Sequence, residues 1–252
     1  EHDIPGFIHQ LSMGNMGAAM SIINERSNLP AICGRVCPMK TVPGHCVLYA
    51  KGKGIQVGKL ERFIADFDTE MNLIRERLPQ KTRGKVAVIG SGPAGLTVAG
   101  DLARHGFNVT IFDGQEEAGG VLMYGIPEYR LPKAVVRKEI EKIEALGVSF
   151  ELNCMVGKDI TVDEMFAKGF DAIFIGTGTA LPKSLDIPGA KLRGVVQSSY
   201  LLHMVSIYNQ NTISRDRVPL IAGEHVGVIG CATLPWMLPA RQSAWVPPAS
   251  VS

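Results

Sequence analysis

The stretch that decides the fold runs Lys85-Val-Ala-Val-Ile-Gly90-Ser-Gly92-Pro-Ala-Gly95-Leu96. A short apolar run, typical of a buried strand, ends at a Gly-x-Gly-x-x-Gly motif that opens a helical stretch. Asp113, 23 residues after Gly90, ends the next apolar run. Because strand, glycine turn, helix and acidic residue agree, the pattern predicts a dinucleotide-binding βαβ unit. The alternative interpretation is a glycine turn without a ligand.

Each position of this motif has a mechanical role in holding a diphosphate. Gly90 permits the tight turn, Gly92 lets the backbone approach the pyrophosphate, and Gly95 lets helix and strand touch. The helix N-terminus supplies N–H donors and partial positive charge to the phosphates. The carboxylate of Asp113 would accept hydrogen bonds from a ribose. The motif alone does not distinguish a nicotinamide from a flavin dinucleotide.

Two later segments favour the flavin. Residues 118–132 form an apolar, glycine-rich loop, too rich in turn residues for a helix, where a long cofactor leaving the first βαβ unit would run. Residues 171–178 read as a strand that ends in Gly-Thr-Gly, which indicates close backbone approach to the same cofactor. An ordinary strand-terminating turn explains the second segment equally well.

The rest of the pattern predicts an α/β fold behind a helical N-terminal part. Residues 3–26 indicate two short helices, with Asp3 and Asn15 as their N-caps. An amphipathic helix is expected over residues 58–78, followed by a polar linker over 78–84 that marks a domain boundary. Beyond the linker we expect strands over residues 85–90, 108–113, 148–152 and 171–176 and helices over residues 94–105 and 133–146.

Composition excludes several classes of protein. The chain has 252 residues, of which 46% are hydrophobic and 20% charged, so a wholly disordered chain is excluded. No apolar stretch reaches the roughly 20 residues that a bilayer demands, and no signal peptide is evident. Lys and Arg total 26 against 24 Asp and Glu, without a basic block. We therefore expect a cytoplasmic protein that binds neither membrane nor nucleic acid.

Three of the five cysteines, Cys33, Cys37 and Cys46, fall within fourteen residues. In a reducing compartment such a group is more often a metal site than a disulfide framework. Taken alone, the segment fits an iron–sulfur cluster, a zinc site with His45 as a ligand, or buried structural thiols. The residues themselves leave these three alternatives open.

Four motifs in this order resemble the NADPH-dependent glutamate synthase small-subunit family; they lie at residues 29–38, 57–63, 90–96 and 119–132. The module also occurs in ferredoxin:NADP oxidoreductase and sulfide dehydrogenase subunits and in dihydropyrimidine dehydrogenase. The resemblance implies a helical domain with two [4Fe-4S] clusters, then an FAD domain that contains an inserted NADPH domain. NADPH would reduce the flavin, and electrons would leave through the clusters.

The resemblance also implies a larger partner subunit, either a glutamate synthase large subunit or a ferredoxin- or sulfide-linked one. The terminal electron acceptor depends on that partner. Accordingly we expect a helical iron–sulfur-type domain over residues 1–80 and an incomplete Rossmann-like FAD domain over 85–224. The start of an NADPH domain is expected over 225–252.

Carried over position by position, the resemblance assigns roles to individual residues. Cys37 and Cys46 match cluster ligands, and Glu61 matches a position that supplies an unusual oxygen ligand. Cys33 matches a common family cysteine that we do not include among the ligands. The FAD residues implied are Gly90, Gly92, Pro93, Ala94, Gly95 and Leu96 at the pyrophosphate, Asp113 at the adenosine ribose, Gly120, Val121 and Arg130 along the flavin, and Val156 and Thr177 near the adenine or pyrophosphate.

Two departures from the family pattern limit what this chain is expected to do. Pro43 stands where the family has a second late cysteine, and the family's further cysteine-rich run lies upstream of the segment that begins at Asp3. We therefore expect an incomplete cluster ligand set. After residues 225–230, which read as a strand, prolines at 235, 239, 247 and 248 exclude the helix that a dinucleotide unit requires.

We interpret this tail as a reading-frame slip. Restoring one guanine after the Cys231 codon allows a translation that completes a second Gly-x-Gly-x-x-Ala fingerprint, and the alternative is a genuine divergent tail. The leading interpretation is an NADPH-dependent flavin oxidoreductase subunit in which the cofactors carry the chemistry. The alternatives are a catalytically incomplete FAD-binding or docking fragment, and an NAD(H)-dependent dehydrogenase with nicotinamide bound at Gly90–Gly95.

Overall fold

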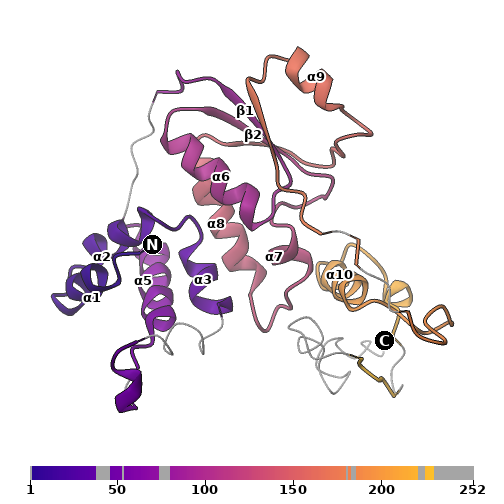
Figure 1. Cartoon of the computed structure of the whole chain (residues 1–252), viewed down its shortest axis with the longest axis horizontal. Coiled ribbons are helices and arrows are strands. Elements are labelled where there is room, and N and C mark those ends of the chain that lie inside the picture. Colours follow the sequence, from indigo (N-terminus) through magenta and orange to yellow (C-terminus); the bar gives the residue numbers. More distant parts are fainter. Residues whose placement is uncertain are drawn as a thin grey trace.

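The computed structural model describes residues 2–37, 46–52, 54–73, 80–179, 181–182, 186–220 and 225–229. A helical module, a Rossmann-type module and a last helical segment follow one another along the long axis of the molecule (Figure 1). The helical module contains α1 (Ile4–Ser12), α2 (Met16–Asn24), α3 (Pro30–Val36), the short 3-10 helix η1 (Tyr49–Lys51) and α5 (Val57–Met71).

Local sequence signals set the limits of the first helices. The Asp3 side chain accepts a hydrogen bond from the Gly6 amide at 3.0 Å, which confirms Asp3 as the N-cap of α1. Asn15 occupies the N-cap position of α2, without a side-chain hydrogen bond to the helix. The amphipathic helix α5 ends at Met71, earlier than the predicted residue 78, because Asn72 adopts a left-handed conformation with φ of 50°.

Helix α3 was not predicted, since the cysteine segment reads as a loop. Pro30 occupies its first turn, where a missing N–H costs nothing. Leu29 and Ile32 are buried in the core of the Rossmann-type module, whereas Ala31 is buried in the core of the helical module. This short helix is therefore packed into both cores, which explains why a seven-residue segment with little periodicity of its own is helical.

The Rossmann-type module is built on a four-stranded parallel sheet with the order β3-β2-β1-β4. Its elements include all the predicted strands and helices, to within one residue at each end, and two helices, α7 and α9, that were not predicted. They are β1 (Lys85–Ile89), α6 (Pro93–Arg104), β2 (Asn108–Phe112), α7 (Val121–Tyr124), α8 (Lys133–Ala145), β3 (Ser149–Glu151), α9 (Val162–Ala167) and β4 (Ala172–Ile175).

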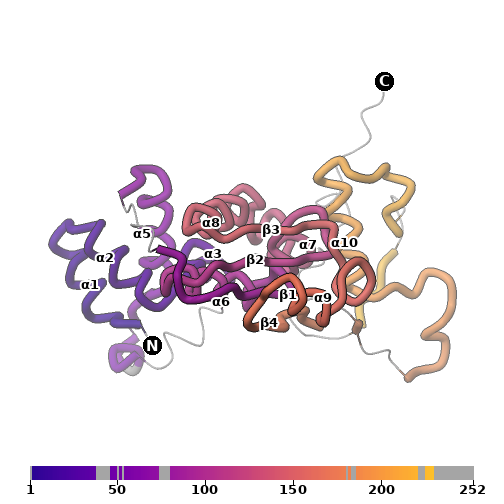
Figure 2. Tube along the Cα trace, turned by 90° about the horizontal axis from the view of Figure 1, so that it is seen from above, coloured from indigo at the N-terminus to yellow at the C-terminus, as the bar shows by residue number. Residues whose placement is uncertain are grey.

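Alternate residues of the central strands bury side chains on opposite faces of the sheet. Val88 and Ile111 belong to the main core beneath α6 and α8, whereas Ala87 and Phe112 belong to a second core that contains Met165 of α9. Figure 2 shows the strands side by side with α6 and α8 alongside them. The sheet is thus covered on both faces, as a parallel sheet requires.

The last segment contains α10 (Ser198–Asn209) and the 3-10 helix η2 (Arg215–Arg217). The Ser206 hydroxyl donates a hydrogen bond of 2.7 Å to the Met123 carbonyl, and the His203 ring stacks on the Tyr124 ring at 5.0 Å. These contacts attach α10 to α7, which lies inside the loop that was expected to contain no helix. The prediction for residues 118–132 is corrected in that respect.

The predicted strand over residues 225–230 is not found: residues 225–229 are exposed and belong to no strand of the described structure. A strand buried in a sheet needs a neighbouring strand, and none of the described segments pairs with these residues. The proline-rich tail and the proposed frame slip lie outside the described residues.

Candidate functional site

The ends of three strands meet at one edge of the sheet. In the register of the strands Ile89 lies beside both Phe112 and Ile175, so the residues that follow them, Gly90, Asp113 and Gly176, lie at the same edge. Ligands of parallel α/β sheets bind outside this carboxyl edge. The predicted site residues of β1, β2 and β4 are thus brought together by strand register alone.

Gly90 is in contact with the end of β4. Its φ of 98° favours glycine, and a Cβ atom there would lie 2.5 Å from the Gly176 carbonyl oxygen and 3.2 Å from the Thr177 Cα. The Gly176 amide donates a hydrogen bond of 2.8 Å to the Ile89 carbonyl. The end of β4 thus lies against the glycine turn, with exposed Thr177 beside it, and the approach of this strand end to a cofactor stays a prediction.

The other two glycines of the motif differ sharply in their surroundings. A Cβ atom on Gly95 would lie 1.9 Å from the Gly90 carbonyl oxygen, so this position allows helix α6 to touch the turn. A Cβ atom on Gly92 would meet no atom within 4 Å. Gly95 therefore serves the fold, while Gly92 faces the open space that the motif reserves for a diphosphate.

Helix α6 begins at this open space. Gly92 is its N-cap and supplies no side-chain cap, and Pro93 and Ala94 at its start are exposed. The N–H groups of the first helical turn have no partners within the helix, and the helix dipole favours an anion there. Leu96 is fully buried and anchors the first turn in the core. An anionic ligand would find donors but no competing side chain.

The glycine-rich loop closes over the same turn. A Cβ atom on Gly120 would lie 2.9 Å from the Gly92 Cα and 3.3 Å from the Gly92 nitrogen. Gly120 has a positive φ of 52° and is the N-cap of α7, whose first residue, Val121, is half exposed. The loop thus lies against Gly92 of the glycine turn, and its predicted position along the flavin stays a prediction.

Asp113 is held by hydrogen bonds within the chain. Its Oδ2 accepts from the Ser91 amide at 2.7 Å and from the Ser91 hydroxyl at 2.6 Å, and its Oδ1 accepts from the Gln115 amide at 2.9 Å. The Ser91 hydroxyl also accepts a hydrogen bond of 3.0 Å from the Gly119 amide. Sequence reasoning missed Ser91, because any residue satisfies its position in the motif.

Two charged side chains of α8, one buried and one in an ion pair, hold the glycine-rich loop in place. Lys133 is 6% exposed, and its ammonium donates hydrogen bonds to the carbonyls of Leu122, at 2.8 Å, and Ile126. Burial lowers the pKa of Lys133 to about 8. Arg137 forms a two-point ion pair with Glu117 at 2.8 and 3.0 Å. These interactions fix the loop before any ligand arrives.

Two predicted residues lie further out. Val156 is half-buried and packs against the second core. It follows a segment whose Cys154 amide donates a hydrogen bond of 2.9 Å to the Asp113 carbonyl. Arg130 is exposed in the turn before α8, and its amide donates to the Pro127 carbonyl at 3.0 Å. The structure thus places Val156 beside the end of β2. Among the described contacts, Arg130 has none with the glycine turn between β1 and α6.

The first two cysteines lie where α3 crosses α5. A Cβ atom on Gly34 would lie 2.7 Å from the Arg62 nitrogen, so only glycine allows this crossing. Burial, reinforced by the charge of Glu61, raises the pKa of Cys33 to about 12. Cys37 is the C-cap of α3 and is exposed. The structure thus brings Cys33, which is not among the predicted ligands, close to Cys37 and Glu61, and the ligand set that the resemblance implies stays a prediction.

Glu61 has an unusual environment. Its Oε1 is buried and has no hydrogen-bond partner among the described residues. Burial and then the charge of Glu139 raise its pKa to about 7. An unpartnered buried carboxylate oxygen is a feature that a ligand could satisfy.

Cys46 has different surroundings. Backbone N–H groups, that of Ile55 foremost, donate hydrogen bonds that lower its pKa. Within the described residues, however, no group of three or more His, Cys, Asp or Glu side chains could hold a metal ion. A [4Fe-4S] cluster needs about four ligands, so the described donors do not fit it, and we assign no electron-transfer step to a cluster.

The fold and the carboxyl-edge site define a nucleotide-binding protein of the Rossmann type, whose glycine turn, helix N-terminus and acidic strand end fit a dinucleotide. Residues 84–232 match the family model described as pyridine nucleotide-disulphide oxidoreductase. The chain belongs to this family. Residues 1–73 match the model described as dihydropyrimidine dehydrogenase domain II, 4Fe-4S cluster. Both matches confirm the predicted fold and the predicted family.

Named relatives point the same way. The chain is 36% identical over 178 residues to the glutamate synthase [NADPH] small chain of Escherichia coli (strain K12), covering 70% of this chain. It is 34% identical over 229 residues to that of Bacillus subtilis (strain 168), covering 90%. It is 36% identical over 233 residues to UacF of Escherichia coli (strain K12), also covering 90%. The chain spans 38%, 46% and 36% of these relatives, respectively.

At the level of the family, the matched models name a 4Fe-4S cluster for residues 1–73 and a pyridine nucleotide for residues 84–232, as predicted, while FAD stays a prediction. The roles of individual site residues and the domain limits at residues 80, 85 and 225 stay predictions. Among the helices that the structure describes, none has the length and apolar character needed to cross a membrane.

Proposed function

We propose that this chain is part of an NADPH-dependent flavin oxidoreductase subunit, in which the carboxyl edge of the sheet holds the diphosphate and adenosine of FAD. The single observation that carries the proposal is the unobstructed Cβ direction of Gly92, at the start of α6 and beside Gly120. Bound flavin would supply the chemistry, accepting a hydride and passing electrons on.

The chain's own residues bind and orient in this proposal. Backbone N–H groups at the start of α6 stabilise the diphosphate charge, and Asp113 accepts a hydrogen bond from the adenosine ribose. Its negative charge disfavours a ribose that carries a 2′-phosphate, so this crevice selects FAD over NADPH. The glycine-rich loop, fixed by Lys133 and Arg137, would lie along the flavin side.

We further propose that the reducing equivalents pass to a larger partner subunit of the glutamate synthase type. The support is the identity to chains named as glutamate synthase small chains. The terminal acceptor follows from the partner. A ferredoxin- or sulfide-linked partner fits the same chain, and co-purification with the partner encoded nearby distinguishes these alternatives.

A second candidate, FAD binding without NADPH oxidation, is favoured by one observation: residues 225–229, expected to begin the NADPH unit, form no strand. Both candidates are tested on the purified chain incubated with FAD and passed through gel filtration. Flavin that stays bound and is bleached by NADPH without air supports the first. Bound flavin that NADPH does not bleach supports the second, and a colourless protein contradicts both.

A further inference from the structure

Ser91 connects three segments that surround the proposed cofactor position. It lies in the turn between β1 and α6, and it is completely buried. Its amide and hydroxyl both donate to Asp113 at the end of β2, and its hydroxyl accepts from Gly119 in the glycine-rich loop. Each of these contacts is 3.0 Å or shorter, so the hydroxyl has little freedom to turn away.

The arrangement determines which oxygen of Asp113 remains available. A carboxylate offers about four acceptor positions, two on each oxygen. The two Ser91 donors occupy Oδ2, and the Gln115 amide occupies one position on Oδ1. Among the contacts described, a single acceptor position on Oδ1 is left for a ligand. Asp113 can therefore accept one further hydrogen bond, and Ser91 decides from which direction.

The same hydroxyl fixes the loop on the other side of the crevice. Gly119 has a φ of 125°, and its amide is buried with the Ser91 hydroxyl as its acceptor. The next residue, Gly120, lies against Gly92. Loss of the hydroxyl would leave the Gly119 amide without this acceptor, which costs more than an ordinary hydrogen bond is worth.

We propose that Ser91 is a positioning residue for the dinucleotide: its hydroxyl aims Asp113 at one ribose hydroxyl and holds the glycine-rich loop over the diphosphate. The inference rests on the proposed function, because it assumes that FAD occupies the crevice. It adds a residue that touches no cofactor atom itself and acts through Asp113 and Gly119.

The test measures FAD binding by the purified chain in a fluorescence titration. Ser91→Ala removes the hydroxyl and keeps the hydrogen bond from the backbone amide of residue 91 to Asp113. We expect the dissociation constant for FAD to rise about tenfold. ADP, which contains the adenosine ribose and diphosphate without the flavin, is expected to lose affinity by a similar factor. Ser91→Thr, which retains a hydroxyl, is expected to recover most of the affinity.

The matched control is Ser206→Ala. It also removes a hydroxyl that bonds to this loop region, at the Met123 carbonyl, but it has no described contact with Asp113. We expect Ser206→Ala to bind FAD like the wild type, even if its thermal stability falls as much as that of Ser91→Ala. This comparison separates positioning from a general loss of stability.

A double-mutant cycle measures the coupling between Ser91 and Asp113 in FAD affinity, which a purely structural role of Ser91 would not produce. In the Asp113→Asn background, Ser91→Ala is expected to cost clearly less than tenfold in FAD affinity, because its main partner is changed. If Ser91→Ala fails to fold, Asp113→Asn alone decides: unchanged FAD affinity in that variant overturns the inference.

Failure of the inference differs from failure of the proposed function. Wild-type chain that binds FAD, together with Ser91→Ala of equal affinity, contradicts the positioning role and leaves the flavin proposal intact. Wild-type chain that binds no FAD contradicts the proposed function, and the inference falls with it.

Discussion

At the scale of single residues, the glycines of the Gly-x-Gly-x-x-Gly motif have different roles in stability and in ligand binding. Gly92 has a φ of −67°, which alanine adopts readily, and its Cβ direction is open. We expect Gly92→Ala to keep the free energy of unfolding within about 0.5 kcal/mol of wild type. We expect its FAD affinity to fall about tenfold or more, because the methyl group occupies the diphosphate position. Urea unfolding and FAD titration measure the two effects separately.

Gly95 should show the opposite result. A Cβ atom there would lie 1.9 Å from the Gly90 carbonyl oxygen, and backbone cannot move aside as a flexible side chain can. We expect Gly95→Ala to lower the free energy of unfolding by about 3 kcal/mol, whether or not FAD is present. Urea unfolding of the ligand-free chain measures this. Stability equal to that of Gly92→Ala would contradict the described contact between α6 and the turn.

These residues also show how far sequence reasoning reaches. The glycine motif and the Asp3 cap are local signals whose physics lies within a few residues, so both were predicted. Ser91 gave no signal, because its role depends on Asp113 and Gly119, which approach only in the folded chain. A residue's role was predictable where local backbone conformation determines it, and not where its side chain connects segments that are distant in the sequence.

At the scale of elements, helices that depend on tertiary contacts were missed. Helix α7 stands in a loop of glycines and prolines, and its end is held by the Lys133 ammonium. Helix α9 could have been found, since Thr161 and Glu164 form a capping box that is legible in the sequence. Helix α3 needed the two cores that bury its faces.

The support of α7 by Lys133 gives a pH dependence with a definite sign. Burial lowers the pKa of Lys133 from its ordinary 10.5 to about 8, so between these values the unfolded chain binds more protons than the folded chain. The contribution of Lys133 to the free energy of unfolding therefore rises from pH 8 to 10.5 and is lost as the pH falls through 8.

Comparison with Lys133→Met measures this contribution. The free energy of unfolding of the wild type minus that of Lys133→Met should increase between about pH 7.5 and about pH 9.5. The titrations of other groups cancel in this difference. Lys138→Met removes an exposed lysine of the same helix and serves as the control. An equal slope for both variants would contradict the burial of the Lys133 ammonium.

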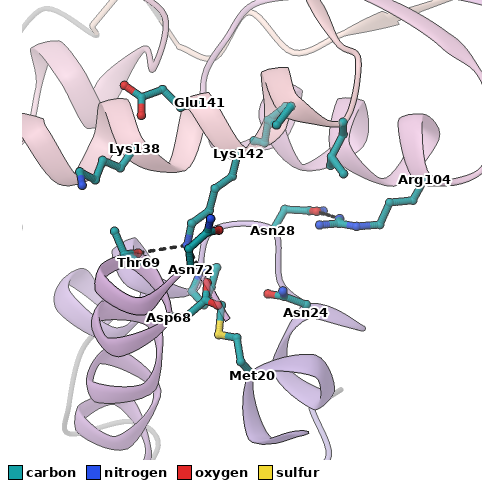
Figure 3. Close-up of a pocket in the computed structure, with 14 residues that line it drawn as sticks. Met20, Asn24, Asn28, Asp68, Thr69, Asn72, Arg104, Lys138, Glu141 and Lys142 are labelled. Carbon is teal, nitrogen blue, oxygen red and sulfur yellow. Dashed lines mark hydrogen bonds and ion pairs between the residues drawn. The ribbon is translucent and has the colours of Figure 1, made fainter. Parts of the chain in front are cut away.

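At the scale of the whole molecule, a charge network joins the helical and Rossmann-type modules. Lys142 on α8 lies 3.2 Å from Asp68 on α5, 3.1 Å from the Thr69 hydroxyl and 3.2 Å from Glu139. Glu139, which is 1% exposed, accepts a hydrogen bond from the Ala31 amide of α3. The network borders a cavity of about 420 Å³ between the modules, where Figure 3 shows Lys142 extending toward Asp68 and Thr69.

This network predicts that the modules unfold together. Lys142→Ala would remove the cation that contacts both Asp68 and the buried Glu139, which is destabilising at such a site. We expect calorimetry to show one transition for the wild type and two for Lys142→Ala, the earlier one from the helical module. Lys138→Ala, at the rim of the same cavity, should keep a single transition. Two transitions already present in the wild type would contradict this coupling.

The walls of the proposed crevice are largely main-chain atoms, with glycine at Gly90, Gly92, Gly119 and Gly120. A sample labelled with nitrogen-15 only at glycine would carry a magnetic resonance probe on each of these walls. Entry of a nucleotide should displace this small set of peaks, while those of Gly14 and Gly169, on turns remote from the carboxyl edge, stay in place. Occupancy could thus be followed amide by amide without altering a single side chain.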